Sequence, residues 1–205
     1  MTMEEMKNLS QEMIQALEEV LRTGASAYRA QPKHTIEDYY ALPDNKRVEL
    51  IDGEVFEMAV PQTTHQALLR NLSFQMESFI RQGNGRCQLF FAPTDVQLDE
   101  QDDTTMVQPD LLIVCDKNKI TEKCIVGAPD FIIEILSPST REKDAFIKAN
   151  KYRQTGVREY WMVDIDKRRV IQYYFEEDCL PTICGFDQAV PVRIYGGDLQ
   201  IVFEA

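Results

Sequence analysis

Two carboxylates in apolar surroundings are the residues of this sequence best suited to chemistry. Glu134 lies inside the run FIIEIL, residues 131–136. As a strand, this run is apolar on both faces, which predicts an interior strand covered on each side. An ionised carboxylate there needs a cation, a metal ion or a proton, because a lone buried charge is costly. Hydrogen bonds to the backbone or to a buried arginine would satisfy Glu134 equally well.

Asp110 stands at the start of a second apolar run, directly after Pro109. Hard divalent cations such as Mg²⁺ bind one or two carboxylates together with water and substrate phosphate. Two acids on neighbouring strands could present such a site. Asp110 taken alone could also be an ordinary acid in a turn at a strand edge.

The segment after residue 137 adds a helix with polar residues at regular spacing. Asp144, Lys148 and Tyr152 are four residues apart and therefore share one helix face. Thr140 is a candidate N-cap, and a helix N-terminus readily accepts a phosphate oxygen. An exposed Asp144–Lys148 ion pair is the structural alternative for this face.

The elements that must position these residues follow from hydrophobic periodicity and from turn residues. Helices are expected over residues 3–23, 35–42, 62–82 and 140–155. A hairpin is expected over residues 47–58 around Asp52-Gly53, and strands over 87–92, 94–98, 110–115, 131–136, 159–163, 169–175, 190–194 and 199–203. This order predicts an α/β (mixed α+β) domain, a mixed sheet flanked by helices, over residues 31–205. Residues 1–30 are expected to form an N-terminal amphipathic helix and a linker.

The charge balance limits the partners of the protein. The chain has 22 Lys and Arg against 34 Asp and Glu, a formal net charge of −12. General electrostatic attraction to nucleic acid is therefore excluded, because phosphates would be repelled. The segment Arg141 to Arg169 differs, with nine basic and five acidic residues. A polyanion could bind at that one place, although a solvated helix face would have the same composition.

The five cysteines form no CxxC pair, so the spacing does not indicate a zinc site. Cys87 and Cys115 lie in apolar runs, and we interpret all five as reduced thiols, with these two buried. Reduced thiols favour a cytoplasmic location. The acidic N-terminus lacks the layout of a secretory signal, and no apolar stretch approaches the roughly 20 residues of a membrane helix. We therefore expect no membrane association.

Several longer strings carry a family resemblance. They are RVELIDGE at residues 47–54, QPDL at 108–111, GAPDFIIEILSPST at 127–140 and GVREYW at 156–161, together with His65 and the Asp144, Lys148, Tyr152 spacing. Between about Thr35 and Phe203 the chain resembles the Uma-two family of restriction-type endonucleases, within the PD-(D/E)XK nuclease superfamily.

The resemblance implies a restriction-endonuclease-like fold, dependence on Mg²⁺ (with Mn²⁺ as a substitute) and hydrolysis of DNA phosphodiester bonds. The implied catalytic residues are Asp110, Glu134, Lys148 and Glu49, the implied metal ligands are Asp110, Glu134 and the carbonyl of Ile135, and the implied substrate-binding residues are Thr140, Tyr152 and His65.

Three of these assignments leave alternatives open. The superfamily expects a lysine where this sequence has Leu136, and Lys148 is the candidate for a migrated amine. Glu49 is the candidate auxiliary acid, but Glu54 and Glu57 lie nearby. For His65, a packed or capping histidine near a helix start is the favoured alternative to a ligand.

Rival functions also remain. A catalytically silent nuclease fold could act as a DNA-binding or transposon-associated accessory module, which Leu136 and the net charge of −12 favour. A structural interaction protein docking through its N-terminal helix, and hydrolysis of RNA or of a small phosphate ester, are further alternatives. No glycine-rich phosphate loop and no GxSxG motif occurs. Double-strand cutting would suit a homodimer or a higher homo-oligomer.

Overall fold

The structure is a computed structural model of the chain, and it describes residues 34–43, 46–83, 86–136, 141–177 and 179–203. The side chains of residues 141–146 are not described. The predicted N-terminal helix and linker and the candidate N-cap Thr140 lie outside the described residues.

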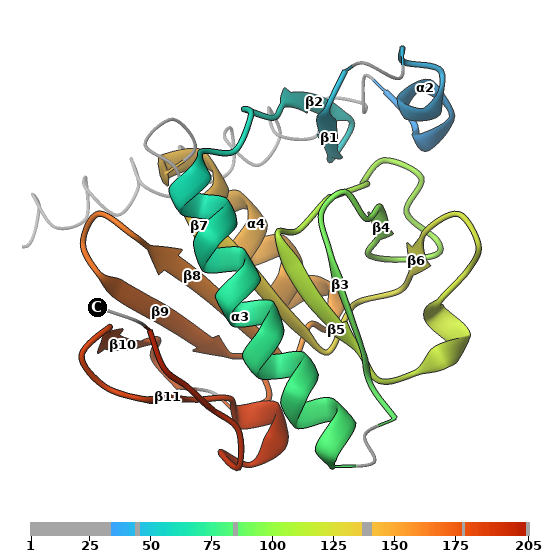
Figure 1. The fold of residues 1–205 in the computed structure, drawn as a ribbon. Helices are drawn as coiled ribbons and strands as arrows, with labels where there is room; N and C mark the ends of the chain where they lie inside the picture. The colour runs from blue at the N-terminus through green and yellow to red at the C-terminus, as the bar shows by residue number, and fades with distance from the viewer. Residues whose placement is uncertain (1–33, 44–45, 84–85, 137–140, 178, 204–205) are drawn as a thin grey trace, which may run out of the picture. The chain divides into compact units, whose positions relative to one another are not determined.

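The described helices and strands follow the sequence pattern closely (Figure 1). The helices are α2 (Ile36–Tyr40), α3 (Thr63–Gln82) and α4 (Arg141–Thr155), with 3-10 turns η1 (Lys117–Lys119) and η2 (Arg193–Tyr195). The strands are β1 (Val48–Ile51), β2 (Glu54–Glu57), β3 (Gln88–Phe91), β4 (Val96–Gln97), β5 (Leu111–Val114), β6 (Ile125–Val126), β7 (Phe131–Leu136), β8 (Glu159–Asp164), β9 (Arg169–Tyr174), β10 (Thr182–Gly185), β11 (Val190–Pro191) and β12 (Gln200–Ile201). Two strands, β6 and β10, were not predicted, and the strand predicted over 190–194 ends early because η2 begins at Arg193.

A six-stranded mixed sheet in the order β10-β9-β8-β7-β5-β3 forms the centre of residues 34–205. β7 and β8 are parallel, and the other neighbours in this sheet are antiparallel. α3 packs on one face, where Leu72 and Ile133 share a core cluster, and α4 packs on the other with Tyr152 and Ile132. The predicted mixed sheet flanked by helices is confirmed, and β7 is covered on both faces as expected.

The hairpin β1–β2 turns at Asp52 and Gly53, whose φ values of 50° and 75° are both positive. Such a turn matches the twist of the two strands and explains the Asp-Gly sequence. The hairpin is attached to the chain before β5, because the backbone N–H and C=O of Leu50 both bond Met106, at 2.8 and 2.7 Å. This attachment brings the hairpin beside Asp110.

A disulfide between Cys87 and Cys115 corrects the prediction of five reduced thiols. β3 pairs with β5 in a register that sets Gln88 opposite Val114, so the adjacent residues Cys87 and Cys115 also face each other. The two positions are 28 residues apart, and only the strand register, which their spacing does not reveal, brings them together. Cys124, Cys179 and Cys184 are free thiols, and the cytoplasmic location stays a prediction.

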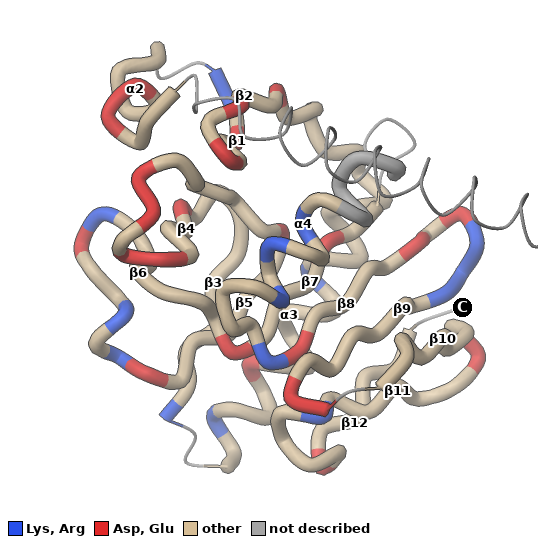
Figure 2. The backbone as a smooth tube through the Cα atoms, turned by 180° about the vertical axis from the view of Figure 1, so that it is seen from behind, with Lys and Arg blue, Asp and Glu red and all other residues tan. Residues whose placement is uncertain are grey.

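In its described part, the predicted basic segment is only partly open to solvent: Arg153, Lys167 and Arg168 are exposed, whereas four other basic side chains are engaged by carboxylates. Lys148 and Lys151 have side chains only 3% and 14% exposed, and both are bonded to carboxylates. Arg158 and Arg169 also pair with acidic side chains. Figure 2 shows Lys and Arg positions interspersed with Asp and Glu positions along the backbone. Among the helices that the structure describes, none is long and apolar enough to cross a membrane.

The buried carboxylate of Glu159 connects β8 to η2 and leads to a prediction about pH. It accepts hydrogen bonds from Trp161 Nε1 at 2.7 Å and from the backbone N–H of Ile194 at 2.9 Å. Burial raises the pKa of Glu159 from 4.5 to about 7. The folded protein therefore binds the carboxyl proton of Glu159 more tightly than the unfolded chain does. Protonation of Glu159 thus stabilises the folded protein, fully below about pH 4.5, and this contribution is lost as the pH rises through about 7.

The melting temperature of the wild-type protein is accordingly expected to fall between pH 5 and pH 8, and the Glu159→Gln variant, neutral throughout, should show a smaller fall. Differential scanning calorimetry of both proteins across this range measures the difference, which corresponds to at most about 3 kcal/mol. Identical pH dependence of the two proteins would contradict the assignment of this proton to Glu159.

Candidate active site

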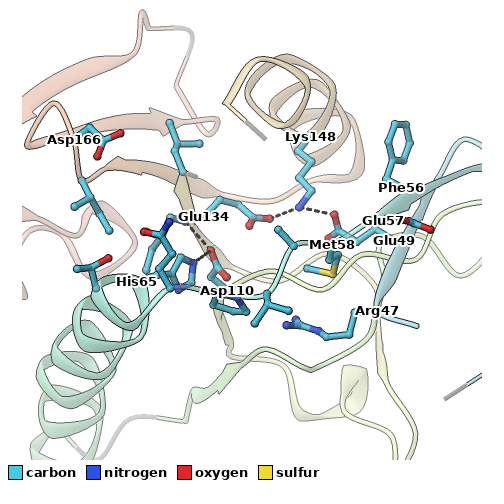
Figure 3. A pocket seen from close by; sticks show the side chains of 18 residues that line it. Arg47, Glu49, Phe56, Glu57, Met58, His65, Asp110, Glu134, Lys148 and Asp166 are labelled. Carbon is cyan, nitrogen blue, oxygen red and sulfur yellow. Dashed lines mark hydrogen bonds and ion pairs between the residues drawn. The ribbon is translucent and has the colours of Figure 1, made fainter. Parts of the chain in front are cut away.

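Asp110 and Glu134 are brought together by the pairing of β5 and β7. The antiparallel register sets Leu111 opposite Ile133, so the next pair outward is Asp110 and Glu134. Directly opposed residues on antiparallel strands lie on the same face of a sheet. The two acids therefore lie close together at one end of adjacent strands, as the sequence predicts for a metal-binding pair (Figure 3).

The carboxylate of Asp110 is held in place by two groups. Its Oδ2 accepts a hydrogen bond from the backbone N–H of Ile135 at 2.8 Å and lies 3.1 Å from Nε2 of His65. His65 lies in the first turn of α3, and its side chain is 12% exposed. The structure thus brings both His65 and Ile135 to the predicted site. His65 contacts Asp110 through its imidazole, and Ile135 contacts Asp110 through its backbone amide. The carbonyl of Ile135 stays a predicted metal ligand.

Glu134 shares a buried ammonium group with Glu49. Lys148 Nζ lies 2.9 Å from Oε1 of Glu134 and 2.8 Å from Oε2 of Glu49, and the three side chains are between 3% and 10% exposed. Tyr152, one turn further along α4, donates its hydroxyl to the same Oε1 of Glu134 at 2.8 Å. The interpretation of Lys148 as half of an exposed ion pair is therefore wrong.

Burial dominates the electrostatics of this group. It raises the pKa of Glu134, and the neighbouring carboxylates of Asp110 and Glu49 raise it further, while Lys148 opposes the shift. The pKa of Tyr152 is also raised well above its usual value by burial and by the charge of Glu134. Tyr152 therefore remains a neutral phenol that donates its proton to the carboxylate.

The structure distinguishes Glu49 from the two nearby glutamates. Glu49 is buried, and its Oε1 accepts the backbone N–H of Gln108 at 2.8 Å, whereas Glu54 and Glu57 are exposed on β2. The Gln108 side chain in turn donates to Tyr39 and Asp95, at 3.0 and 2.8 Å. Nothing in the sequence pattern indicated these two supporting residues.

A pocket of about 400 Å³ opens over the acids. The loop of residues 58–62 between β2 and α3 forms one wall, and Ile165 and Asp166 after β8 contribute to another. Arg47 also lines it, and the sequence analysis did not single out this residue. The alternation of β1 is the signal that could have found it, because residues 47 and 49 point to the same side of a strand.

The acids fit a partial metal site. Among the described residues, no group of three or more His, Cys, Asp or Glu side chains is arranged to hold a metal ion. In the same part of the chain, the hydrogen bonds of Asp110 and Glu134 all go to one oxygen of each carboxylate, so the second oxygen remains available. Two carboxylates completed by water and a substrate phosphate are a usual Mg²⁺ environment.

The hydroxyl of Tyr152 should contribute measurably to the stability of this buried cluster. Tyr152→Phe keeps the ring packing but removes one hydrogen bond to Glu134, so the free energy of unfolding is expected to fall by about 1–2 kcal/mol. Tyr173→Phe is the matched control, since Tyr173 stacks on Tyr160 and its hydroxyl has no hydrogen bond among the described residues. Urea titrations of both variants measure the difference, and equal effects would contradict the proposed contribution.

The fold and the paired acids define a protein of the restriction-endonuclease-like class. The structure is similar to the crystal structure of a putative nuclease of DUF820 from Anabaena variabilis, with a TM-score of 0.69 and 20% identity. The similarity covers 82% of this chain and 94% of that one. At this identity it establishes the fold.

The chain belongs to the Uma2 family, whose model is described as "Putative restriction endonuclease" and matches residues 36–189. The predicted family resemblance is thereby confirmed. No curated protein matches the sequence significantly.

Proposed function

We propose that this protein is a metal-dependent endonuclease that hydrolyses DNA phosphodiester bonds. The observation that carries the proposal is the convergence of Asp110, Glu134 and Lys148 from three separate elements at the wall of one pocket. Membership of the Uma2 family supports the same reaction class. A buried amine beside paired carboxylates fits hydrolysis of an anionic ester, because a positive side chain and two carboxylates that would bind a cation line the same pocket.

Asp110 and Glu134, with the carbonyl of Ile135, would hold Mg²⁺ or Mn²⁺. The bound ion would neutralise charge on the phosphate and lower the pKa of an attacking water. His65 and the Ile135 amide orient Asp110 by their contacts with Oδ2. Lys148 would direct its charge to the water or the phosphate, while Glu49 holds the amine in place.

The three residues predicted to bind substrate complete the proposal. Tyr152 fixes the Glu134 carboxylate through its hydroxyl. Thr140, which directly precedes α4 in the sequence, would contact a substrate phosphate, and His65 would contact the substrate beside Asp110. We also propose a cytoplasmic location and a homodimer or higher homo-oligomer, since cutting both strands of a duplex is served by two active sites. Light scattering of the full chain measures the oligomeric state.

A divalent-ion assay on supercoiled plasmid DNA tests the function. With Mg²⁺ or Mn²⁺, we expect conversion to nicked and linear forms, and with EDTA, we expect none. Single-stranded RNA and bis(p-nitrophenyl) phosphate, incubated in parallel, distinguish a DNA nuclease from an RNase or a small-ester hydrolase. Absence of cleavage with every ion would contradict the proposal.

The alternative is a silent nuclease fold that binds DNA as an accessory module. Leu136 at the position where the superfamily expects lysine favours it, as does the engagement of Lys148 by two carboxylates. Isothermal titration with Mg²⁺ and Mn²⁺ separates the two functions. Millimolar or tighter binding that is lost in Asp110→Asn supports the enzyme, whereas DNA binding with no metal binding supports the silent module.

A further inference from the structure

Arg47 lines the pocket, and its guanidinium group is incompletely hydrogen-bonded. Its Nε is buried but has no hydrogen-bond partner in the part of the chain that the structure describes. Figure 3 shows its side chain extending from the start of β1 beneath Met58 toward the side of the pocket that holds Asp110. A buried guanidinium nitrogen without a hydrogen-bond partner is costly, and an anion from outside the chain would satisfy it.

The other basic side chains near the site are already engaged. Lys148 is bonded to two carboxylates, and Lys151 to Asp52 and Asp102. Among the described residues, Arg47 forms no ion pair with an acidic side chain, although it lies in the same pocket as Glu49 and Glu57. Among the described residues that line the pocket, Arg47 is therefore the basic side chain that has no carboxylate partner.

The chemistry of the guanidinium group identifies the class of anion. Its planar fork of N–H donors binds two oxygens of one phosphate, which an ammonium group cannot do. Arg47 directly precedes β1, and its carbonyl accepts the N–H of Met58 at 3.0 Å. Its place two residues before Glu49 therefore sets it on the same side of the hairpin as the buried cluster. A phosphate held there would lie in the same pocket as Asp110 and Glu134.

We propose that Arg47 binds a backbone phosphate of the substrate strand and so positions that strand across the two acids. This inference rests on the proposed nuclease function. In a pocket lined by several carboxylates, Arg47 supplies attraction for the phosphate backbone that the overall charge of −12 does not. It acts on substrate binding, whereas the acids act on bond cleavage.

Fluorescence anisotropy with a labelled DNA duplex tests the proposal in the Asp110→Asn background with Mg²⁺, so that the probe is not cut. Arg47→Gln is expected to raise Kd about tenfold and to lower the slope of log Kd against log salt by about one. Arg47→Lys keeps the charge but loses the fork, so the slope should remain while Kd rises by a smaller factor.

Arg81→Gln is the matched control, because Arg81 carries the same charge on the last turn of α3 with its side chain 79% exposed. It should leave both Kd and slope unchanged. If Arg47→Gln binds the duplex with the wild-type affinity and salt slope, the role of Arg47 is overturned while the nuclease function stands. If the protein with Arg47 intact binds no duplex either as Asp110→Asn with Mg²⁺ or as wild type in EDTA, both are overturned.

With all other residues wild type, steady-state kinetics distinguish the role of Arg47 in substrate binding from the role of the acids in bond cleavage. Arg47→Gln should raise KM for plasmid DNA with little change in kcat, because only binding is weakened. A fall in kcat at unchanged KM would overturn the assignment to binding. Thermal unfolding followed by circular dichroism verifies that each variant is folded.

Discussion

Asp110→Asn is expected to lower the rate of DNA cleavage by at least about 100-fold while the protein stays folded. Asparagine has nearly the same shape, and its side-chain oxygen can still accept the hydrogen bond of the Ile135 amide. The negative charge that would attract a divalent cation is lost, and so is the charged partner of His65. Initial rates of plasmid nicking, with circular dichroism spectra of both proteins, measure the effect.

Glu57→Gln serves as the control for this experiment. Glu57 also lines the pocket, but it is exposed on β2. In the sequence analysis it was an alternative to Glu49 as the auxiliary acid. It should cleave within about twofold of the wild-type rate, since exposed charges contribute little. Equal activity of the wild-type protein and Asp110→Asn would instead point to a contaminating nuclease and refute the assignment.

Lys148→Met is expected to produce the largest loss of stability among the variants considered, about 3–5 kcal/mol in the free energy of unfolding. The methionine side chain fills similar space, but it leaves the carboxylates of Glu49 and Glu134 buried beside each other without a cation. Uncompensated buried charge of this kind is among the costliest single changes in a protein. Urea unfolding at pH 7 measures the loss.

The ion pair between Arg81 and Glu77 provides the comparison. Their atoms approach to 2.6 Å, closer than Lys148 approaches either of its partners, but the Arg81 side chain is 79% exposed. Arg81→Met should therefore cost no more than about 0.5 kcal/mol. A similar loss for both variants would show that the Lys148 cluster is not an effectively buried charge network.

Acid should partly rescue Lys148→Met. As the pH falls, Glu134, whose pKa is raised by burial, takes up a proton more readily in the folded variant than in its unfolded chain, so the stability difference from the wild-type protein should shrink. Combining Lys148→Met with Glu134→Gln should rescue it at neutral pH for the same reason. Additive losses in the double variant would contradict this coupling.

The sequence predicted the elements and the paired acids because local patterns determine both. An acid within or beside an apolar run is visible without a structure, and Glu134 and Asp110 each stand out in this way. The helical spacing of Lys148 and Tyr152 was also visible. Both residues contact Glu134 because α4 packs on the sheet face that carries it.

The contacts that were missed depend on strand register and on long-range docking. Cys87 meets Cys115 only because β3 pairs with β5 in one register. Glu49 reaches Lys148 only because the hairpin is attached to Met106, which no pattern near residue 49 reveals. Arg47 appeared in the sequence only as the first residue of a family string, and its significance comes from the pocket that it lines.

The ammonium of Lys148 has one further consequence, because its two carboxylate partners lie 85 positions apart in the sequence. Glu49 belongs to the hairpin and Glu134 to the central sheet, so the same amine fastens one to the other. Any local opening that lifts the hairpin must also withdraw Glu49 from the amine and carry Arg47 away from the acids. Assembly of the proposed catalytic arrangement and closure of the hairpin are thus expected to be a single cooperative event, and hydrogen exchange at β1 should report on both.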